Sequence, residues 1–205
     1  GWTYGEVLDK AAAGDFRANM LAGEYWMGLY YLNRGDLPLA CLEHMQHFFR
    51  DAATASGHPA PKLMMTDPYG IFGIFKAQPM QPEHAEWLAA CRKLAEKGDM
   101  DAVTALYTVT DLPEAELRRY LAPLEKKAAS GDQDALAQLA FIKVDWLKEN
   151  PANVIETLKQ YRKNAKPVLL ARIGELALAL DGKDGRGWRL SLIHISEPTR
   201  QEAIS

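Results

Sequence analysis

The stretch CLEHMQHFF carries the residues best suited to bind a metal ion. Cys41, His44 and His47 follow one another at intervals of three residues, and thiolate and imidazole are ligands that suit zinc and related metals. In a helix, residues three apart share a face, but Cys41 and His47 diverge by about 120° around the axis. Two interpretations follow: a metal site formed by these three residues, or histidines that pack beside Phe48 or face solvent.

Signatures of other enzyme chemistry are scarce in the sequence. It contains neither a Gly-x-Ser-x-Gly nucleophile motif nor a glycine-rich phosphate loop after an expected strand. Acidic residues such as Glu83 and Glu114 stand near expected helix starts, where the helix dipole favours a carboxylate. We therefore predict a protein that is not an enzyme and uses no cofactor. The alternative is a metal-dependent enzyme or metal-binding module that uses Cys41, His44 and His47.

Aromatic side chains are concentrated in one short segment, which contains Tyr25, Trp26, Tyr30 and Tyr31. If these rings are buried, they fill the space between helices. If they are exposed, tyrosine and tryptophan are the residue types that most often anchor a protein interface. Both roles stay open from the sequence.

A Gly-Asp pair recurs three times in similar surroundings. It occurs in DKAAAGDFRANMLAG from Asp9, in RKLAEKGDMDAVTALY from Arg92 and in KKAASGDQDALAQLA at residues 126–140, each time with an alanine three residues after the aspartate. Glycine ends a helix by adopting a left-handed conformation, and aspartate caps the start of the next helix. The pattern predicts that Gly14, Gly98 and Gly131 each lie in a turn between two helices.

Apolar residues recur at helical spacing along nearly the whole chain. Between Asp15 and Asn33 they form one stripe, made of Ala18, Ala22, Tyr25, Leu29 and Leu32. A pair of helices cannot bury both of its faces, so neighbouring pairs must stack. We therefore predict an all-α fold of antiparallel helix pairs, stacked as a short α-solenoid.

Prolines interrupt this pattern in two places. Residues 57–82 contain five of the eleven prolines and predict a long ordered loop. That loop either packs onto the helices and seals a core, or lines a binding surface. Pro123 stands inside a helical stretch, so we expect a break or a kink near Ala122.

The repeated motifs resemble two families of helical repeats. The pattern Ala-Ala-x-Gly-Asp-x-x-Ala at Ala128–Ala135 resembles the helix-turn-helix unit of Sel-one-like repeats, Ala12–Ala18 matches it closely, and Leu94–Ala102 matches it more loosely. Tetratricopeptide-like spacing is found for Gly28, Tyr31, Gly35, Asp36 and Ala40.

The resemblance implies a function as well as a fold. Members of these families bind other proteins or peptides on a concave helical surface. In a tetratricopeptide-like register, Tyr25, Leu29, Leu32 and Asn33 would face that surface. The resemblance further implies a bacterial adaptor or cell-envelope scaffold, in the cytoplasm or the periplasm, whose partner is a protein or peptide.

Composition excludes several other classes of protein. A net charge of −3 over 205 residues gives no reason to expect binding to nucleic acid. No apolar run approaches the roughly 18 residues that span a bilayer. Cys41 and Cys91 are too few for a disulfide framework, so the cellular compartment stays open.

The two ends of the chain suggest a fragment. LSLIHISEPTR, residues 190–200, resembles the translation of a sequencing-library adaptor used in transposase-based DNA preparation. We therefore expect 190–205 to be a non-native tail and the native segment to be truncated near Arg189. The chain starts at Gly1 without a methionine, so an upstream targeting segment could be missing.

The predicted organisation is one helical-repeat domain over 1–189. First repeats would occupy 1–56, the ordered loop 57–82, and further repeats 83–189.

Overall fold

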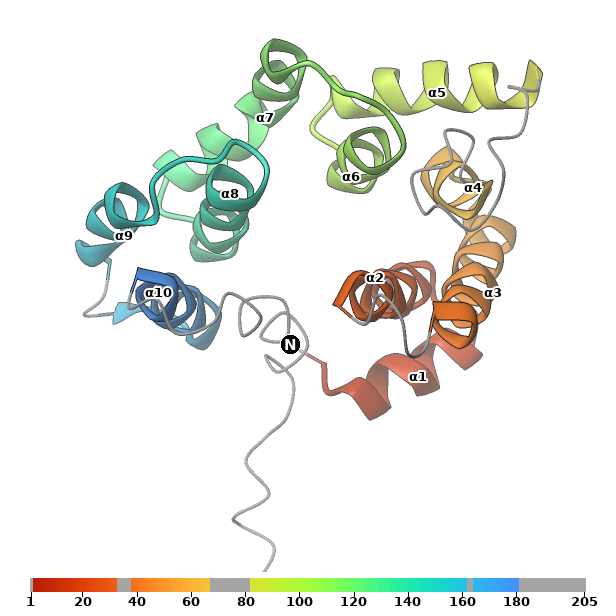
Figure 1. The fold of residues 1–205 in the computed structure, drawn as a ribbon, viewed down its shortest axis with the longest axis horizontal. Helices are drawn as coiled ribbons and strands as arrows, with labels where there is room; N and C mark the ends of the chain where they lie inside the picture. The colour runs from red at the N-terminus through yellow and green to blue at the C-terminus, as the bar shows by residue number, and fades with distance from the viewer. Residues whose placement is uncertain (1, 33–37, 67–81, 162–163, 181–205) are drawn as a thin grey trace, which may run out of the picture. The chain divides into compact units, whose positions relative to one another are not determined.

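A computed structural model describes residues 2–32, 38–66, 82–161 and 164–180 (Figure 1). These residues form α-helices and no strand. The helices are α1 (Tyr4–Ala12), α2 (Phe16–Leu32), α3 (Pro38–Ser56), α4 (Pro59–Thr66), α5 (Pro82–Ala95), α6 (Met100–Val109), α7 (Glu114–Ala129), α8 (Gln133–Asp145), α9 (Pro151–Lys159) and α10 (Pro167–Leu180). Consecutive helices pack on one another in most of the chain, which confirms the predicted all-α, α-solenoid-like fold.

The three Gly-Asp pairs lie where the sequence predicts them. Gly14 joins α1 to α2, Gly98 joins α5 to α6, and Gly131 joins α7 to α8. Their φ angles are +83°, +82° and +86°, in the left-handed region that glycine enters without a steric cost. The prediction that each glycine lies in an interhelical turn is confirmed.

Hydrogen bonding makes the three turns equivalent. In each, the glycine N–H donates to the carbonyl three residues earlier at 2.9–3.0 Å, and the aspartate N–H donates to the carbonyl five residues earlier at 3.0–3.3 Å. This is the Schellman arrangement. The aspartate side chain then accepts from the N–H three residues on, that of Ala18, Ala102 or Ala135, at 2.8–3.0 Å. All three alanines are buried, so a side chain larger than a methyl group would not fit there without rearrangement.

The chain divides into two compact units, with the boundary between Tyr120 and Leu121. That boundary falls inside α7, which runs unbroken through Pro123. The alternative of a break near Ala122 is therefore wrong, and the alternative of a kink there stays a prediction. Proline removes one backbone hydrogen bond, but Leu121 and Leu124 are buried on either side of it, and their burial offsets that loss. The sequence predicts one domain over 1–189, whereas the contacts separate two units within the described residues.

The first unit is built around contacts of α2 and α4. Helix α2 packs on α1 and α3, and α4 packs on α3, α5 and α6. Gly23 allows α2 to approach α3 closely, because a Cβ atom there would stand 2.5 Å from the ring of Phe49. A Cβ atom on Gly28 would meet nothing within 4 Å. The glycine that sets this helix contact is thus Gly23 and not Gly28, which the tetratricopeptide-like spacing singles out.

Part of the predicted proline-rich loop is a helix. Pro59 and Pro61 lie in the first turn of α4, where their missing N–H groups would have no partner within the helix. Leu63 and Met64 of the same helix are fully buried. The prediction of a loop over 57–82 is therefore wrong for Pro59–Thr66, which seals the core of the first unit. The remainder of that segment, 67–81, lies outside the described residues.

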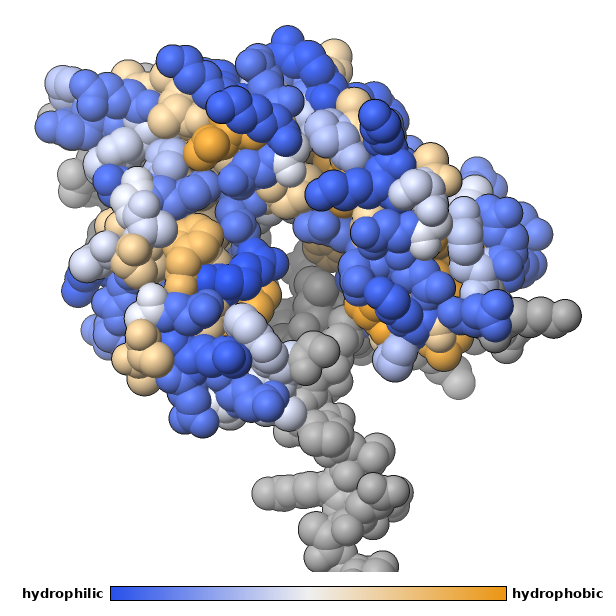
Figure 2. Space-filling view, turned by 180° about the vertical axis from the view of Figure 1, so that it is seen from behind, coloured by the Kyte–Doolittle hydropathy of each residue, from blue (hydrophilic) through white to orange (hydrophobic). Residues whose placement is uncertain are grey.

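The second unit is centred on α8, α9 and α10, which pack on one another. Its apolar core contains Ala137, Ala140, Val154, Leu158, Leu169 and Leu176. Hydrophilic side chains cover most of the face drawn in Figure 2, and apolar side chains form smaller areas. The large hydrophobic side chains that are exposed in the described chain are Leu170 and Leu180, both on α10. The expected tail, 190–205, lies outside the described residues. None of the described helices is long and apolar enough to cross a membrane.

Candidate interaction surface of the first unit

The Cys41, His44 and His47 cluster does not converge on one point. Cys41 is buried, and burial raises the pKa of its thiol, which disfavours the thiolate that a metal needs. The ring of His44 stacks on Trp26, and His47 lies 3.6 Å from a carboxylate oxygen of Asp51. Among the residues that the structure describes, no group of three or more His, Cys, Asp or Glu side chains could hold a metal ion.

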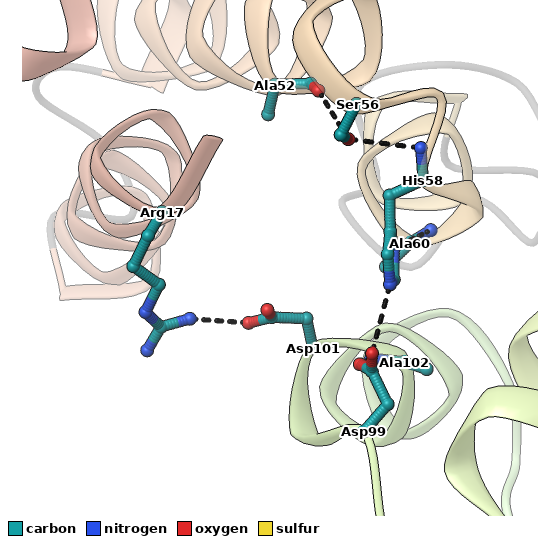
Figure 3. A network of polar contacts seen from close by, with 8 residues as sticks. All are labelled: Arg17, Ala52, Ser56, His58, Ala60, Asp99, Asp101 and Ala102. Atoms are coloured by element: carbon teal, nitrogen blue, oxygen red, sulfur yellow. Dashed lines mark hydrogen bonds and ion pairs between the residues drawn. The ribbon is translucent and has the colours of Figure 1, made fainter. Parts of the chain in front are cut away.

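Ser56, His58 and Asp99 lie together at the junction of α3, α4 and α6 (Figure 3). No sequence motif marks these three residues as a group. His58 Nε2 lies 3.2 Å from Asp99 Oδ2, and His58 Nδ1 accepts from the N–H of Ala60 at 3.1 Å. Ser56 donates its hydroxyl to the carbonyl of Ala52. Since His58 Nδ1 is occupied by a backbone N–H, the ring has no nitrogen left to activate Ser56. The arrangement caps α4 and ties it to α6.

A second polar link joins α2 to α6. Arg17 Nη1 lies 2.5 Å from Asp101 Oδ1 (Figure 3). The arginine side chain is 49% exposed and the aspartate 19%, so solvent screens the pair and its contribution to stability is small. The position of this ion pair nevertheless identifies the face of α2 that is directed toward α6.

Glu24 lies on that same face of α2. It follows Arg17 by seven residues, which is close to two helical turns. Burial is the main cause that raises the pKa of Glu24 to about 7; Arg17 opposes the rise and Asp101 adds to it. The residue is half-buried, so it is neither fully solvated nor sealed inside the core. We refer to the surface that carries Arg17, Glu24 and Asp101 as the α2–α6 face.

The apolar stripe predicted between Asp15 and Asn33 faces α1 along part of its length. Ala18 and Ala22 belong to one core cluster with Val7 and Ala11 of α1. Tyr25 continues this contact, with its ring centroid 4.8 Å from that of Tyr4 in α1. The sequence pattern therefore marks these positions of α2 as apolar, but it does not separate a packed face from an open one.

The structure describes two of the four predicted peptide-binding residues fully, Tyr25 and Leu29. Tyr25 and Leu29 are half-buried. Leu32 is the last residue of α2, its side chain lies outside the described part, and so does all of Asn33. The structure brings Tyr25 next to Tyr4 and Trp26, and whether it contacts a peptide stays a prediction.

Rings from three helices form a continuous row, which we name the aromatic ladder: Tyr4, Tyr25, Trp26 and His44. Successive centroids are 4.8, 5.6 and 4.3 Å apart. His44 is exposed and the other three rings are half-buried. In α2 every residue from Glu24 to Leu29 is half-buried, which means that no side of this part of the helix is fully covered.

Comparisons of the chain with known proteins found no match. No family model matches the chain, and no curated protein or solved structure matches it significantly. The likeness to Sel-one-like and tetratricopeptide-like repeats therefore rests on the sequence motifs alone.

The second unit contains two buried charged residues, Arg172 and Glu175. Arg172 and Glu175, both on α10, are buried and form an ion pair. The guanidinium also lies 5.1 Å from the ring centroid of Phe141, and burial lowers the pKa of Arg172. In the described structure, Arg172 Nε and one oxygen of Glu175 are buried without a hydrogen-bond partner. This pair carries an unrelieved desolvation cost.

Proposed function

We propose that the first unit is a helical-repeat interaction module that binds a segment of another protein or a peptide, and that it is not an enzyme. The observation that carries this proposal is the partial exposure of the aromatic ladder and of α2 from Glu24 to Leu29. Tyrosine and tryptophan are the residues that contribute most to binding when a partner covers them.

The ladder is also held in place before any partner arrives. Tyr25 contacts Tyr4, and Trp26 contacts both Tyr25 and His44. Gly23 fixes α2 close to Phe49 of α3. Rings that are already ordered lose little conformational entropy on binding, so a larger part of the contact energy is retained as affinity.

The sequence resemblance supports the same proposal. Sel-one-like and tetratricopeptide-like repeats present helical surfaces to protein partners, and a bacterial adaptor or envelope scaffold fits that role. In this chain the binding residues would centre on Trp26, with Tyr25 and Leu29 from the predicted set.

A displayed library of random peptides tests the proposal without knowledge of the natural partner. Peptides retained by the immobilised protein are synthesised, and their affinities are measured by fluorescence anisotropy. The matched variants are Trp26→Ala and Trp87→Ala. Both indoles are half-buried in the first unit, and each contacts one histidine ring, His44 or His84.

We expect Trp26→Ala to weaken binding by about tenfold or more, and Trp87→Ala to leave it within about twofold of the parent. Circular dichroism confirms that both variants are folded. If the library yields no peptide above background, or if the two variants lose affinity equally, the proposal is wrong.

A further inference from the structure

Charge on the α2–α6 face is unbalanced. It carries two carboxyl groups, Glu24 and Asp101, and one guanidinium, Arg17. Arg17 forms an ion pair with Asp101, in which Nη1 lies 2.5 Å from Oδ1. The face therefore keeps one acidic group, Glu24, with no cation of its own.

Glu24 differs in this respect from every comparable acid of the unit. Among residues 2–32, 38–66 and 82–120, the half-buried acidic residues are Glu24, Asp51, Asp99, Asp101 and Glu116. Four of the five lie against a cationic or histidine side chain, and Glu24 has no hydrogen bond or ion pair within the described chain. The partners are His47 for Asp51 at 3.6 Å, His58 for Asp99 at 3.2 Å, Arg17 for Asp101 at 2.5 Å and Arg92 for Glu116 at 3.4 Å.

We propose that the α2–α6 face binds a basic segment of the partner, and that a lysine or arginine side chain of that segment forms an ion pair with Glu24. This inference rests on the proposed function and narrows it to one class of partner. The docked cation would complete a second ion pair beside Arg17 and Asp101, so that each carboxylate on the face has one cationic partner.

Charge complementarity favours this occupant over the alternatives. An acidic segment would meet Glu24 and Asp101, and like charges brought together oppose binding. An apolar segment would cover the Glu24 carboxylate without giving it a hydrogen bond, which is unfavourable. A basic side chain removes that cost, because its cation gives the Glu24 carboxylate a partner.

The protonation of Glu24 supports the inference and supplies a readout. The charged groups that act on its carboxyl are Arg17 of the same helix and Asp101 of α6, and together with burial they place the pKa at about 7. Charged side chains of α1 and α3, which also pack against α2, do not contribute. A cation binds the ionised form, so docking should tighten about tenfold between pH 6 and pH 8.

The test uses the peptides retained by the library, each compared with a version in which lysine is replaced by norleucine and arginine by citrulline. Affinities are measured at pH 6 and pH 8 for the parent protein, Glu24→Gln and Glu43→Gln. Glu43 is an exposed acid of α3 in the same unit and serves as the matched control. Glutamine has the size of glutamate, and circular dichroism verifies the fold of both variants.

We expect retained peptides to be rich in lysine and arginine. At pH 8 the neutral versions and Glu24→Gln should each bind about tenfold more weakly, Glu24→Gln should lose the pH dependence, and Glu43→Gln should keep both properties. The pH dependence of the parent protein tests the inference even if Glu24→Gln does not fold.

The two proposals fail differently. Peptides that bind well without a basic residue, or that bind Glu24→Gln and the parent equally at both pH values, would overturn the basic partner and leave the interaction module standing. A library that yields no ligand at all overturns the proposed function, and the basic partner with it.

Discussion

The two units place their charges in different ways. In the first unit, two half-buried carboxylates pair across helices: Asp101 of α6 with Arg17 of α2, and Asp99 before α6 with His58 before α4. In the second unit, the buried pair of Arg172 and Glu175 lies within one helix, α10. A pair between helices depends on how those helices are placed, whereas a pair three residues apart forms wherever the helix forms.

The difference teaches where each unit can respond to a partner. Charges on the α2–α6 face of the first unit keep contact with solvent, so a ligand can exchange with water there at moderate cost. The Arg172 and Glu175 charges of the second unit are already removed from water, and their role is confined to the core. Five predictions test this contrast, beginning with the largest expected effect.

Breaking the buried pair of the second unit should destabilise the protein most. Arg172→Ala leaves the Glu175 carboxylate buried without its cation, and we expect the free energy of unfolding to fall by about 3–5 kcal/mol. Replacement of both residues, as Arg172→Met with Glu175→Leu, should cost less than the single substitution, because the Glu175 charge is removed together with its cation. Urea unfolding monitored by circular dichroism measures both. Equal losses in the single and double variants would contradict a charge-based origin.

The same glycine-to-alanine change should have opposite signs in the two units. A Cβ atom at Gly23 would stand 2.5 Å from the ring of Phe49, whereas at Gly174 in α10 it would meet nothing within 4 Å. Gly23→Ala should therefore destabilise by about 1–3 kcal/mol through overpacking. Gly174→Ala should stabilise by about 0.5–1 kcal/mol, because alanine is the better helix former. Thermal unfolding compares the two, and a stabilised Gly23→Ala would show that α2 does not approach α3 this closely.

The glycines also show how far the sequence reaches. Gly14, Gly98 and Gly131 are predictable because the Gly-Asp turn and its cap involve residues close in the chain. Gly23 is not predictable in this way, because its role depends on Phe49 of the next helix. The motif spacing points to Gly28 instead, which has open space around its α-carbon.

Features that depend on contacts between residues far apart in the chain cannot be predicted from local sequence motifs for the same reason. Pro59 and Pro61 suggest a loop, because a proline-rich segment and a proline-capped helix look alike until their buried neighbours are known. The isolation of Glu24 depends on Arg17 pairing with Asp101, which is 84 residues away. The sequence could mark Tyr25 and Leu29 as apolar positions of α2. It could not tell that Ala18, Ala22 and Tyr25 turn toward α1.

The pH dependence of stability should separate Glu24 from the paired acids around it. Its folded-state pKa of about 7 lies above the ordinary value of 4.5, so the folded protein binds this proton more tightly, and stability falls as pH rises through that window. Glu24→Gln cannot ionise, and we expect it to exceed the parent by roughly 1–3 kcal/mol at pH 8 and to equal it at pH 4. Urea unfolding at pH 4, 6 and 8 measures the difference.

Asp99 provides the opposite control within the same unit. The hydrogen bond from His58 is the largest cause that lowers the pKa of Asp99. Its contribution to stability is therefore present above the unfolded pKa and is lost as pH falls through the folded one. Asp99→Asn should be less stable than the parent at pH 8, and the gap should narrow toward pH 3. Parallel pH profiles for the two variants would refute the distinction between a paired and an isolated carboxylate.

The smallest effect is expected at the link between α2 and α6. Arg17 is 49% exposed in its pair with Asp101, so Arg17→Gln should cost no more than about 0.5–1 kcal/mol, and added salt should reduce the difference further. Arg17→Gln should change the affinity for basic peptides by a larger amount, and it should strengthen that binding. Without Arg17, the α2–α6 face carries two carboxyl groups and no cation, so basic peptides should bind more tightly, and anisotropy at low and high salt measures this gain. Weaker binding by Arg17→Gln would mean that the arginine itself contacts the partner, and that the face recognises an acid as well as a base.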